Sequence, residues 1–526
     1  MRRRIRISVA GLVLAVVVAA CGTIGSGDDG AREAADIEQA PTVYEQEVPA
    51  GGERLLFEYG PVTVQPGQNP IEFSGLDVPK PDFDGYITRI AADIRREDGT
   101  VPPVDVIHLH HGVWLNLEGT SRGAPQPQFF AAGEEKTVTN IPEGYGYEYR
   151  ADDRWILNYM LHNLYPLTED IWITYELDIV PLDAPEAGDI EAVQPLWMDV
   201  RNGEIYPVFD VIKGSGHDGV FTYPDDAPDA YAEDGWIKNE WYVDREATIV
   251  WTGGHLHPGG LHTDLYVERG PSVSSPPIDP RADAQPPDIE RAHLFSSEAW
   301  YYEPAGAVSW DVAMTTTPSD WRVAVEPGDR LTISVSYDAA RASWYESMGI
   351  MIAWLADGTD GADPFSDDVA VEGVLTHGHL AENDNHGGEP AELPDATELD
   401  ARPIDGPIDI VDFVYGAGDT SEEAEWIPSV TQGESLEFNN VDAPVAAGIW
   451  HTITACKAPC NQSTGIAYPL ADADVEFDSG QLGNAGAPTT GQLTWQTPSD
   501  LEPGTYTYFC RVHPFMRGAF SVEPAG

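Results

Sequence analysis

Cysteine is scarce in this chain, which has only Cys21, Cys456, Cys460 and Cys510 among 526 residues. Small secreted domains held together by disulfide bonds carry a much higher density of cysteine, so the sequence excludes a scaffold of that class. Hydrophobic residues make up 42% of the chain, which is enough for packed cores. The length suits about three domains.

Basic residues are also few: 28 Lys and Arg stand against 88 Asp and Glu, a net charge of −60. A surface of this sign repels phosphate backbones, so we expect no nucleic-acid partner. Aromatic residues reach 10%, which excludes a disordered acidic tail. The functional prediction therefore has to come from particular residues.

Long apolar runs are missing except near the N-terminus, where residues 9–20 form a run too short to span a bilayer comfortably. Four arginines precede it, and it ends in VAACG with Cys21 in the fourth place. This pattern resembles the lipobox of bacterial lipoproteins, which implies a signal peptide over residues 1–21 and a lipid on the sulfur of Cys21. An ordinary secretory leader with an incidental cysteine is the alternative. We expect an extracytoplasmic protein anchored to the bacterial cell membrane through this lipid.

Helical periodicity is scarce as well, and strand-like runs recur along the mature chain. Examples are IWITYEL at 171–177, ATIVW at 247–251 and LTISVSY at 331–337. Turn residues separate these runs, among them many of the 43 prolines and 51 glycines. The pattern predicts an all-β chain of sandwiches or barrels.

The most informative motif is YTYFCRVHPFMRG at residues 506–518. It places the thiolate of Cys510, the imidazole of His513 and the thioether of Met516 within seven residues, a set that suits a soft, redox-active metal. A trigonal Cys-His-His set with a weak axial Met is the blue-copper arrangement. The second imidazole should come from an upstream strand, and His451 in IWHTITA supplies it.

Residues 408–526 therefore resemble the cupredoxins, most closely the amicyanin and pseudoazurin type. The resemblance implies a Greek-key β-sandwich in which His451, Cys510, His513 and Met516 bind type 1 copper. It also implies one-electron transfer with a redox partner protein or a small electron donor.

Cys456 and Cys460 form the separate pattern CKAPC just after the predicted His451 strand. An extracytoplasmic location permits a disulfide bond that pins this loop. A second metal site built on the two thiolates is the alternative.

Six of the remaining twelve histidines lie in three short segments of the N-terminal two-thirds. They are His108, His110 and His111 in the first segment, His162 in the second, and His255 with His257 in the third. Alternation along a strand puts His255 and His257 on one face, where two imidazoles can chelate a metal. Met348 follows later, before another apolar strand-like run.

This order resembles the copper type II, ascorbate-dependent monooxygenases, which include the peptidylglycine α-hydroxylating and dopamine β-monooxygenases, over residues 51–375. The resemblance implies two tandem jelly-roll-like β-sandwiches with one copper each. The implied ligands are His110, His111 and His162 for an electron-storing copper, and His255, His257 and Met348 for a catalytic, oxygen-activating copper.

The chain also departs from that family. No cysteine lies between Cys21 and Cys456, and the arginine that anchors a peptide carboxylate would fall near Gly253. His108 could replace one of the adjacent pair, and His262 could join or tune the second site. Ordinary core histidines and a zinc site are the alternatives to the dicopper interpretation.

On the monooxygenase interpretation, the blue-copper domain supplies electrons where the related enzymes use ascorbate, and dioxygen and a small organic substrate meet at the second copper. The competing hypothesis is a non-enzymatic, lipid-anchored electron-transfer or copper-holding protein whose N-terminal sandwiches serve for docking.

The predicted organisation has five parts after the leader. They are a flexible tether at 22–50, a first sandwich at 51–190, a second at 191–375, a linker at 376–407 and the cupredoxin domain at 408–526. The linker region contains His377, His379 and His386, which either lie in a solvated polar segment or close over a metal cleft.

Overall fold

The computed structural model describes most of the chain outside the leader and several connecting segments. The described residues are 5–6, 43, 46–67, 71–104, 106–164, 167–201, 208–227, 240–271, 273, 288–302, 312–380, 394–421, 424–443, 449–458, 475–486, 489–513 and 515–526. The predicted all-β class is confirmed, because these residues form strands and short 3-10 turns without an α-helix. None of the described helical segments has the length and apolar character that crossing a bilayer demands.

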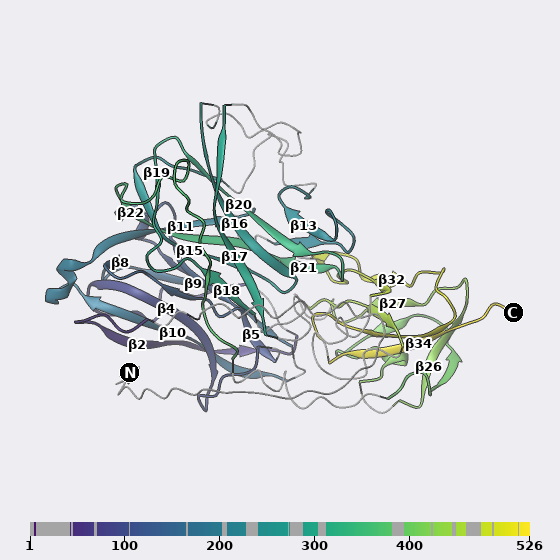
Figure 1. The fold of residues 1–526 in the computed structure, drawn as a ribbon. Coiled ribbons are helices and arrows are strands. Elements are labelled where there is room, and N and C mark those ends of the chain that lie inside the picture. The colour runs from purple at the N-terminus through teal and green to yellow at the C-terminus, as the bar shows by residue number, and fades with distance from the viewer. Residues whose placement is uncertain are drawn as a thin grey trace, which may run out of the picture.

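Two sheets form the first sandwich, drawn in purple and blue in Figure 1. One sheet contains β2 (Glu53–Val64), β4 (Gly85–Arg96), β7 (Val138–Asn140), β8 (Tyr145–Tyr149) and β10 (Glu169–Pro181), with β1 (Ile5–Arg6) paired to β2. The other contains β3 (Glu72–Phe73), β5 (Ile107–Asn116), β6 (Gln128–Gly133) and β9 (Trp155–Asn163). Trp114 of β5 meets Tyr175 of β10 at 5.2 Å between ring centroids, so apolar side chains of the two sheets share one core.

The second sandwich, in teal, is built in the same way (Figure 1). One sheet contains β11 (Glu191–Asp199), β15 (Ala247–Leu256), β18 (Val312–Thr316), β19 (Val323–Val325), β22 (Gly349–Asp357) and β23 (Val374–Leu375). The other contains β13 (Val220–Tyr223), β14 (Glu240–Tyr242), β16 (Gly260–Arg269), β17 (Glu290–Tyr301) and β20 (Arg330–Asp338), and β12 (Phe209–Val211) pairs with β21 (Trp344–Ser347) beside them.

Strand β11 joins the two sandwiches. Its first residues, from Glu191, pair in parallel with β8 of the first sandwich, and its remainder, from Gln194, pairs antiparallel with β22 of the second. The connection before it carries the 3-10 turn η2 (Pro185–Asp189). Hydrophobic residues of β22, such as Trp354, are buried in the core of the first sandwich. The two sandwiches therefore share packing as well as a strand.

The C-terminal region, in green and yellow, lies beside both sandwiches (Figure 1). Its larger sheet contains β24 (Asp400–Pro403), β26 (Trp426–Thr431), β28 (Thr454–Lys457), β29 (Phe477–Asp478), β33 (Gly504–Phe509) and β34 (Arg517–Glu523). The smaller sheets contain β25 (Ile408–Ile410), β27 (Glu437–Asn440) and β32 (Thr494–Gln496), and β30 (Ala485–Gly486) with β31 (Thr489–Thr490). The other 3-10 turns among the described residues are η1 (Gly119–Arg122) and η4 (Gly416–Gly418).

Arg511 fixes the C-terminal region against the second sandwich. Its guanidinium lies 4.7 Å from the ring centroid of Trp344, and its Nη1 lies 3.6 Å from an Asp478 carboxylate oxygen. The hydroxyl of Tyr345 donates to the same carboxylate at 2.8 Å, and Lys213 Nζ donates to the carbonyl of Val475 at 2.8 Å. The contact therefore combines hydrogen bonds, charge and aromatic packing.

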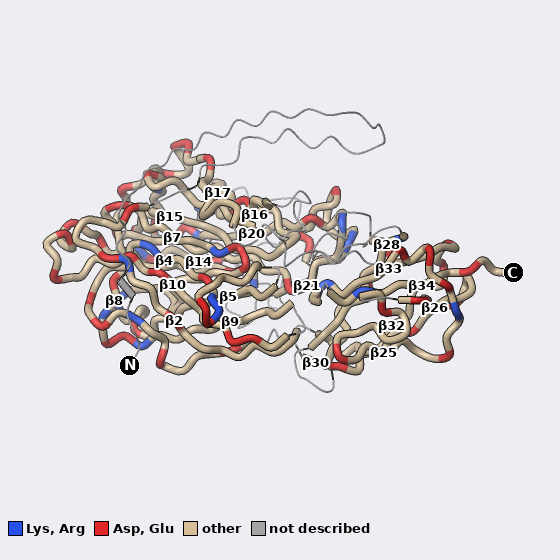
Figure 2. The backbone as a smooth tube through the Cα atoms, turned by 90° about the horizontal axis from the view of Figure 1, so that it is seen from below, with Lys and Arg blue, Asp and Glu red and all other residues tan. Residues whose placement is uncertain are grey.

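Acidic residues occur along all three parts of the chain (Figure 2). Several of the few cations are engaged in ion pairs, for example Arg54 with Asp178 at 2.6 Å and Arg269 with Asp329 at 2.7 Å. The net charge of −60 thus leaves a strongly acidic exterior around cores that are apolar.

Candidate metal centres

The residues around the C-terminal CRVHPFM segment form the first candidate centre. His451 lies just before β28, while Cys510 and His513 follow β33, so two neighbouring antiparallel strands bring them together. The sulfur of Cys510 lies 3.8 Å from His451 Nδ1 and 3.7 Å from His513 Nδ1, and the two nitrogens are 3.1 Å apart. All three residues are buried. One metal ion at bond lengths of roughly 2.0–2.3 Å reaches all three atoms of this triangle.

Supporting contacts orient these donors. His451 Nε2 lies 3.0 Å from the carboxylate of Asp442, which leaves Nδ1 for the metal, and the backbone N–H of Thr452 donates to the Cys510 sulfur at 3.4 Å. Burial raises the pKa of the Cys510 thiol, but hydrogen bonds from His451 and His513 outweigh this and hold it well below its ordinary value. The fourth predicted ligand, Met516, is fully buried in the same core as Cys510.

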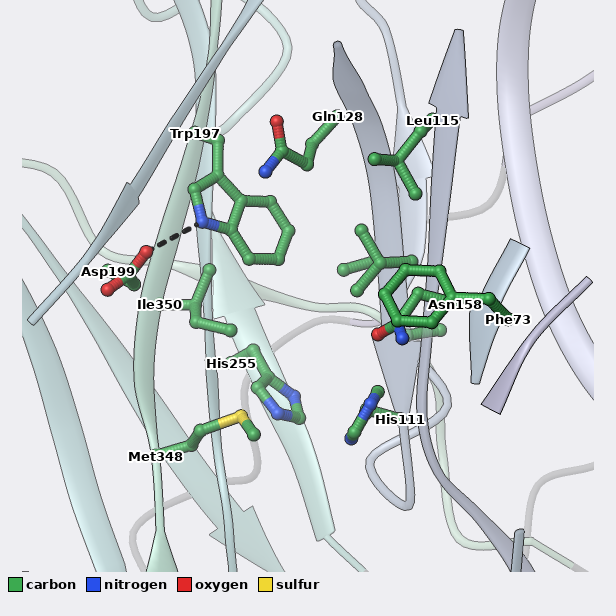
Figure 3. A pocket seen from close by; sticks show the side chains of 13 residues that line it. Phe73, His111, Leu115, Gln128, Asn158, Trp197, Asp199, His255, Met348 and Ile350 are labelled. Carbon is green, nitrogen blue, oxygen red and sulfur yellow. Dashed lines mark hydrogen bonds between the residues drawn. The ribbon is translucent and has the colours of Figure 1, made fainter. Parts of the chain in front are cut away.

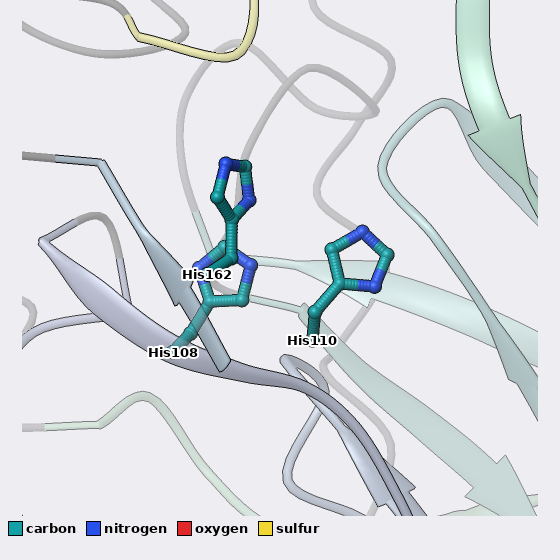
Figure 4. A group of neighbouring side chains, drawn as sticks. All are labelled: His108, His110 and His162. Atoms are coloured by element: carbon teal, nitrogen blue, oxygen red, sulfur yellow. The ribbon is translucent and has the colours of Figure 1, made fainter. Parts of the chain in front are cut away.

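Three histidines of the first sandwich form the second centre, His108, His110 and His162 (Figure 4). His108 on β5 pairs directly with His162 on β9, and a β-bulge between Leu109 and His111 interrupts this register at His110. The donor atoms lie within 4.8 Å of one another, and all three rings are buried. The third member of this group is thus His108, which the sequence predicts as an alternate ligand.

The chemistry of this group suits a metal. His108 Nδ1 donates to the Val104 carbonyl at 2.5 Å, so its Nε2 carries a lone pair. Burial lowers the pKa of His108 to about 4 and the pKa values of His110 and His162 well below the ordinary value. Neutral imidazoles at neutral pH are the form that ligates metals.

His111, the other predicted member, faces a different space. With His255 and Met348 it lines a cavity of about 180 Å³ between the sandwiches (Figure 3). The other lining residues are mostly apolar and include Phe73, Val113, Leu115, Ala131, Trp197 and Ile350. His255 and Met348 therefore meet at one end of an apolar cavity, together with His111.

His257 lies near His255, with 5.1 Å between their ring centroids, but it belongs to another group. Donor atoms of His257, His110 and Glu134 lie within 4.8 Å of one another, and all three residues are buried. His257, predicted for the second copper together with His255 and Met348, thus adjoins His110 and Glu134 as well as His255. His262, the other alternate, lies on β16, where its Nδ1 contacts Asp264 at 3.0 Å.

The C-terminal centre and the three-histidine group lie against each other. The ring centroids of His513 and His162 are 6.4 Å apart, with the planes nearly perpendicular. His513 Nε2 also lies 3.4 Å from the carbonyl oxygen of Gly67 in the first sandwich. His513 of the C-terminal centre is thus covered by the first sandwich.

Carboxylates near these histidines are not evident from the histidine pattern. Glu135 Oε2 lies 2.9 Å from His255 Nδ1. The backbone carbonyl of Glu346 accepts a hydrogen bond from His257 Nδ1 at 2.6 Å. Burial raises the pKa of Glu134 well above its ordinary value, whereas His255 outweighs the effect of burial and lowers that of Glu135. The adjacent pair Glu134-Glu135, directly after an apolar strand-like run, is the signal that could have pointed to them.

The remaining predicted residues have separate surroundings. His377 contacts the Glu135 carbonyl at 2.5 Å, and His379 lies 5.4 Å from Tyr302 between ring centroids, while His386 falls outside the described residues. Cys456 is held in a disulfide bond. Its predicted partner Cys460 and the predicted lipid-bearing Cys21 also lie outside the described residues, so both assignments stay predictions.

Comparison with known proteins adds little to this geometry. No family model matches the chain, and no curated protein sequence matches it. A copper-containing nitrite reductase from Thermus scotoductus SA-01 is similar over 53% of this chain and 55% of its own, at 12% identity and a TM-score of 0.15. The match spans about half of that protein's length, and a likeness this slight carries no argument about function.

Proposed function

We propose that the protein is a copper-dependent electron-transfer protein whose C-terminal centre exchanges electrons with a second copper at His108, His110 and His162. The observation that carries the proposal is the contact between His513 and His162, 6.4 Å between ring centroids. A ligand of one centre thus adjoins a ligand of the other, with no intervening side chain required between the two rings.

Copper suits the first centre because a thiolate, two imidazoles and a thioether form the donor set of blue-copper sites, which cycle between Cu(I) and Cu(II). The residues of the chain do the rest: Asp442 orients His451, the Thr452 N–H stabilises the thiolate, and burial excludes water. The three-histidine set suits copper as well as zinc, and its position beside a redox centre favours copper.

A comparison of two variants tests the proposal. In copper-loaded wild-type protein, a blue centre reduced by a small donor should be reoxidised rapidly by the N-terminal metal. His162→Phe removes the ligand that faces His513 and should slow this step at least tenfold, whereas His111→Phe should not. Equal rates in all three proteins, followed by stopped-flow absorbance, would overturn the proposed route.

Oxygen-dependent hydroxylation of a small organic molecule is the second candidate function. The apolar cavity lined by His111, His255 and Met348 favours it, since such a cavity holds a small substrate beside metal-type side chains. Reduced, copper-loaded protein should then consume oxygen in the presence of a substrate. Absence of consumption with any electron donor would leave electron transfer alone.

The location outside the cytoplasmic membrane, with a lipid on Cys21, is supported by the leader sequence. Cys21→Ser should release the protein from the membrane fraction of the expressing bacterium. A variant that stays with the membrane would contradict the lipid anchor.

A further inference from the structure

The group His110, Glu134 and His257 shares His110 with the electron-transfer route, but neither that route nor the apolar cavity uses Glu134 or His257. Its members come from three places in the chain: His110 from β5, Glu134 from the turn after β6, and His257 from the residue after β15. The exposed fractions of these three residues are 4%, 1% and 3%. Packing of both sandwiches is needed to assemble the group.

Glu134 is the most informative member. It is 1% exposed, and neither carboxylate oxygen makes a hydrogen bond to the described part of the chain. Burial of a carboxylate without hydrogen bonds or a cation costs several kcal/mol. Lys136, two residues further on, is engaged with Asp93 at 2.9 Å between Nζ and Oδ1.

Adjacent Glu135 differs from Glu134 because one of its carboxylate oxygens accepts two hydrogen bonds. Its Oε1 accepts from the backbone N–H of Gly133 at 3.0 Å and from the hydroxyl of Thr137 at 2.5 Å, and its Oε2 lies 2.9 Å from His255. The turn thus presents one carboxylate with partners and one, Glu134, that faces two imidazoles.

The contacts of His257 define its tautomer. Its Nδ1 lies 2.6 Å from the carbonyl oxygen of Glu346, and a carbonyl only accepts, so Nδ1 carries the hydrogen and Nε2 carries a lone pair. Nε2 lies 4.0 Å from Glu134 Oε1. This distance is too long for a hydrogen bond, yet two ligand bonds of about 2.0–2.2 Å span it.

Glu346 supports the same conclusion from another direction. Its φ of +57° is rare for a residue with a side chain, and such strained positions cluster at functional sites. In this conformation its carbonyl holds His257, while its carboxylate lies 3.9 Å from His110 Nε2. A second carboxylate is therefore close to the same group.

We infer that a divalent first-row transition ion binds between His110, Glu134 and His257, with His110 placed between this ion and the three-histidine centre. Two imidazoles and a carboxylate form a borderline donor set that binds Zn²⁺ or Cu²⁺ and leaves coordination positions open. This ligand set differs from the sequence prediction, which completes the site of His257 with His255 and Met348. It does not depend on electron transfer from the C-terminal centre.

Metal stoichiometry distinguishes the two ligand sets. Full-length protein is stripped with a chelator, reloaded with excess Cu²⁺ or Zn²⁺ and desalted, and the metal per chain is measured for four proteins. Wild type and Met348→Leu should bind equal amounts, Glu134→Gln should bind one ion fewer, and the matched neighbour Glu135→Gln should keep the wild-type number. Full binding by Glu134→Gln, or loss of an ion from Met348→Leu, would overturn the inference.

Two further readouts keep the test decisive. The blue absorption of the C-terminal centre, which shares no ligand with this group, should be unchanged in Glu134→Gln, which shows that the variant is folded and separates this result from the proposed electron-transfer function. If that variant does not fold, anomalous scattering from crystals of copper-loaded wild type locates the ions directly. A peak between His110, Glu134 and His257 is expected, and its absence, or a peak at the Met348 sulfur in its place, would contradict the inference.

Discussion

The C-terminal centre and the N-terminal cluster assemble metal-type side chains in opposite ways. Three of the four predicted C-terminal ligands lie within the seven residues from Cys510 to Met516, on one turn between β33 and β34. The N-terminal groups instead draw on β5, β9, the turn after β6 and the end of β15, and so on both sandwiches.

This difference has consequences for chemistry and stability. A thiolate on a short loop defines a soft, closed site in which no position is left for a substrate. The N-terminal histidines and carboxylates are harder donors: the three-histidine group needs β5 and β9 of the first sandwich, and the group of His110, Glu134 and His257 needs both sandwiches packed together. We therefore expect the two regions to respond differently to mutation and to acid.

The largest expected effect is the loss of the thiolate. Cys510→Ser should abolish the blue absorption completely, because the oxygen of serine does not replace the sulfur–copper bond. Metal bound at the N-terminal groups should remain, since none of their residues lies in this loop. The visible spectrum checks the loss of the blue absorption, and metal analysis checks that the N-terminal metal is retained. Loss of all metal would show that the two regions are not separable.

The next effect concerns which histidine completes the three-histidine centre. His108→Ala removes a ligand of one N-terminal metal ion. It should therefore lower the affinity for that ion by more than the roughly 10–100-fold that is typical of losing a residue that only supports a ligand. His111→Ala should leave that ion in place, since His111 faces the apolar cavity. Competition titration with a chelator measures the metal affinity of both variants. A larger loss of affinity in His111→Ala than in His108→Ala would instead support the ligand set predicted from the sequence.

Acid should destabilise the metal-free N-terminal cluster. Burial lowers the pKa of both His108 and His111 from 6.5 to about 4. Between pH 6.5 and pH 4, these two histidines therefore bind protons in the unfolded chain but stay neutral in the folded protein. The free energy of unfolding should therefore fall as the pH drops from about 6.5 to about 4, by up to roughly 3 kcal/mol for each histidine.

Urea denaturation between pH 7 and pH 4 measures this effect. The many carboxylates change protonation over part of the same range, so a His108→Gln/His111→Gln variant serves as the control that shares their contribution. Stability of the wild type should fall more steeply than that of the control. Parallel curves would contradict the buried, neutral state of these rings.

The smallest expected effect lies at the contact between the two regions. Gly67 has a φ of +61°, and a Cβ there would come within 2.2 Å of the Phe413 ring and 2.6 Å of His513 Nε2. Gly67→Ala should cost about 1–3 kcal/mol and shift the blue absorption. Gly99→Ala, at a φ of +84° with open space around the Cβ, should cost only the backbone strain and leave the spectrum unchanged; equal behaviour of the two variants would show that the contact is loose.

The same contrast explains what could be predicted from the sequence. The all-β class follows from strand-like runs between turn residues, and the C-terminal set could be proposed because its spacing is local. The choice of His108 over His111 depends on the β-bulge at His110, and the role of Glu134 depends on packing between two sandwiches. Residue spacing reveals neither feature, so His108, His110 and His111 look equivalent as ligands in the sequence.

In the proposed function, electrons cross directly between the two regions through the contact of His513 with His162. Pulse reduction of fully oxidised, copper-loaded protein, followed at the blue absorption, tests it most directly. We expect the blue centre to be reduced and then reoxidised in a first-order step whose rate does not change with protein concentration. A blue centre that stays reduced, or a reoxidation rate that rises in proportion to protein concentration, would contradict it.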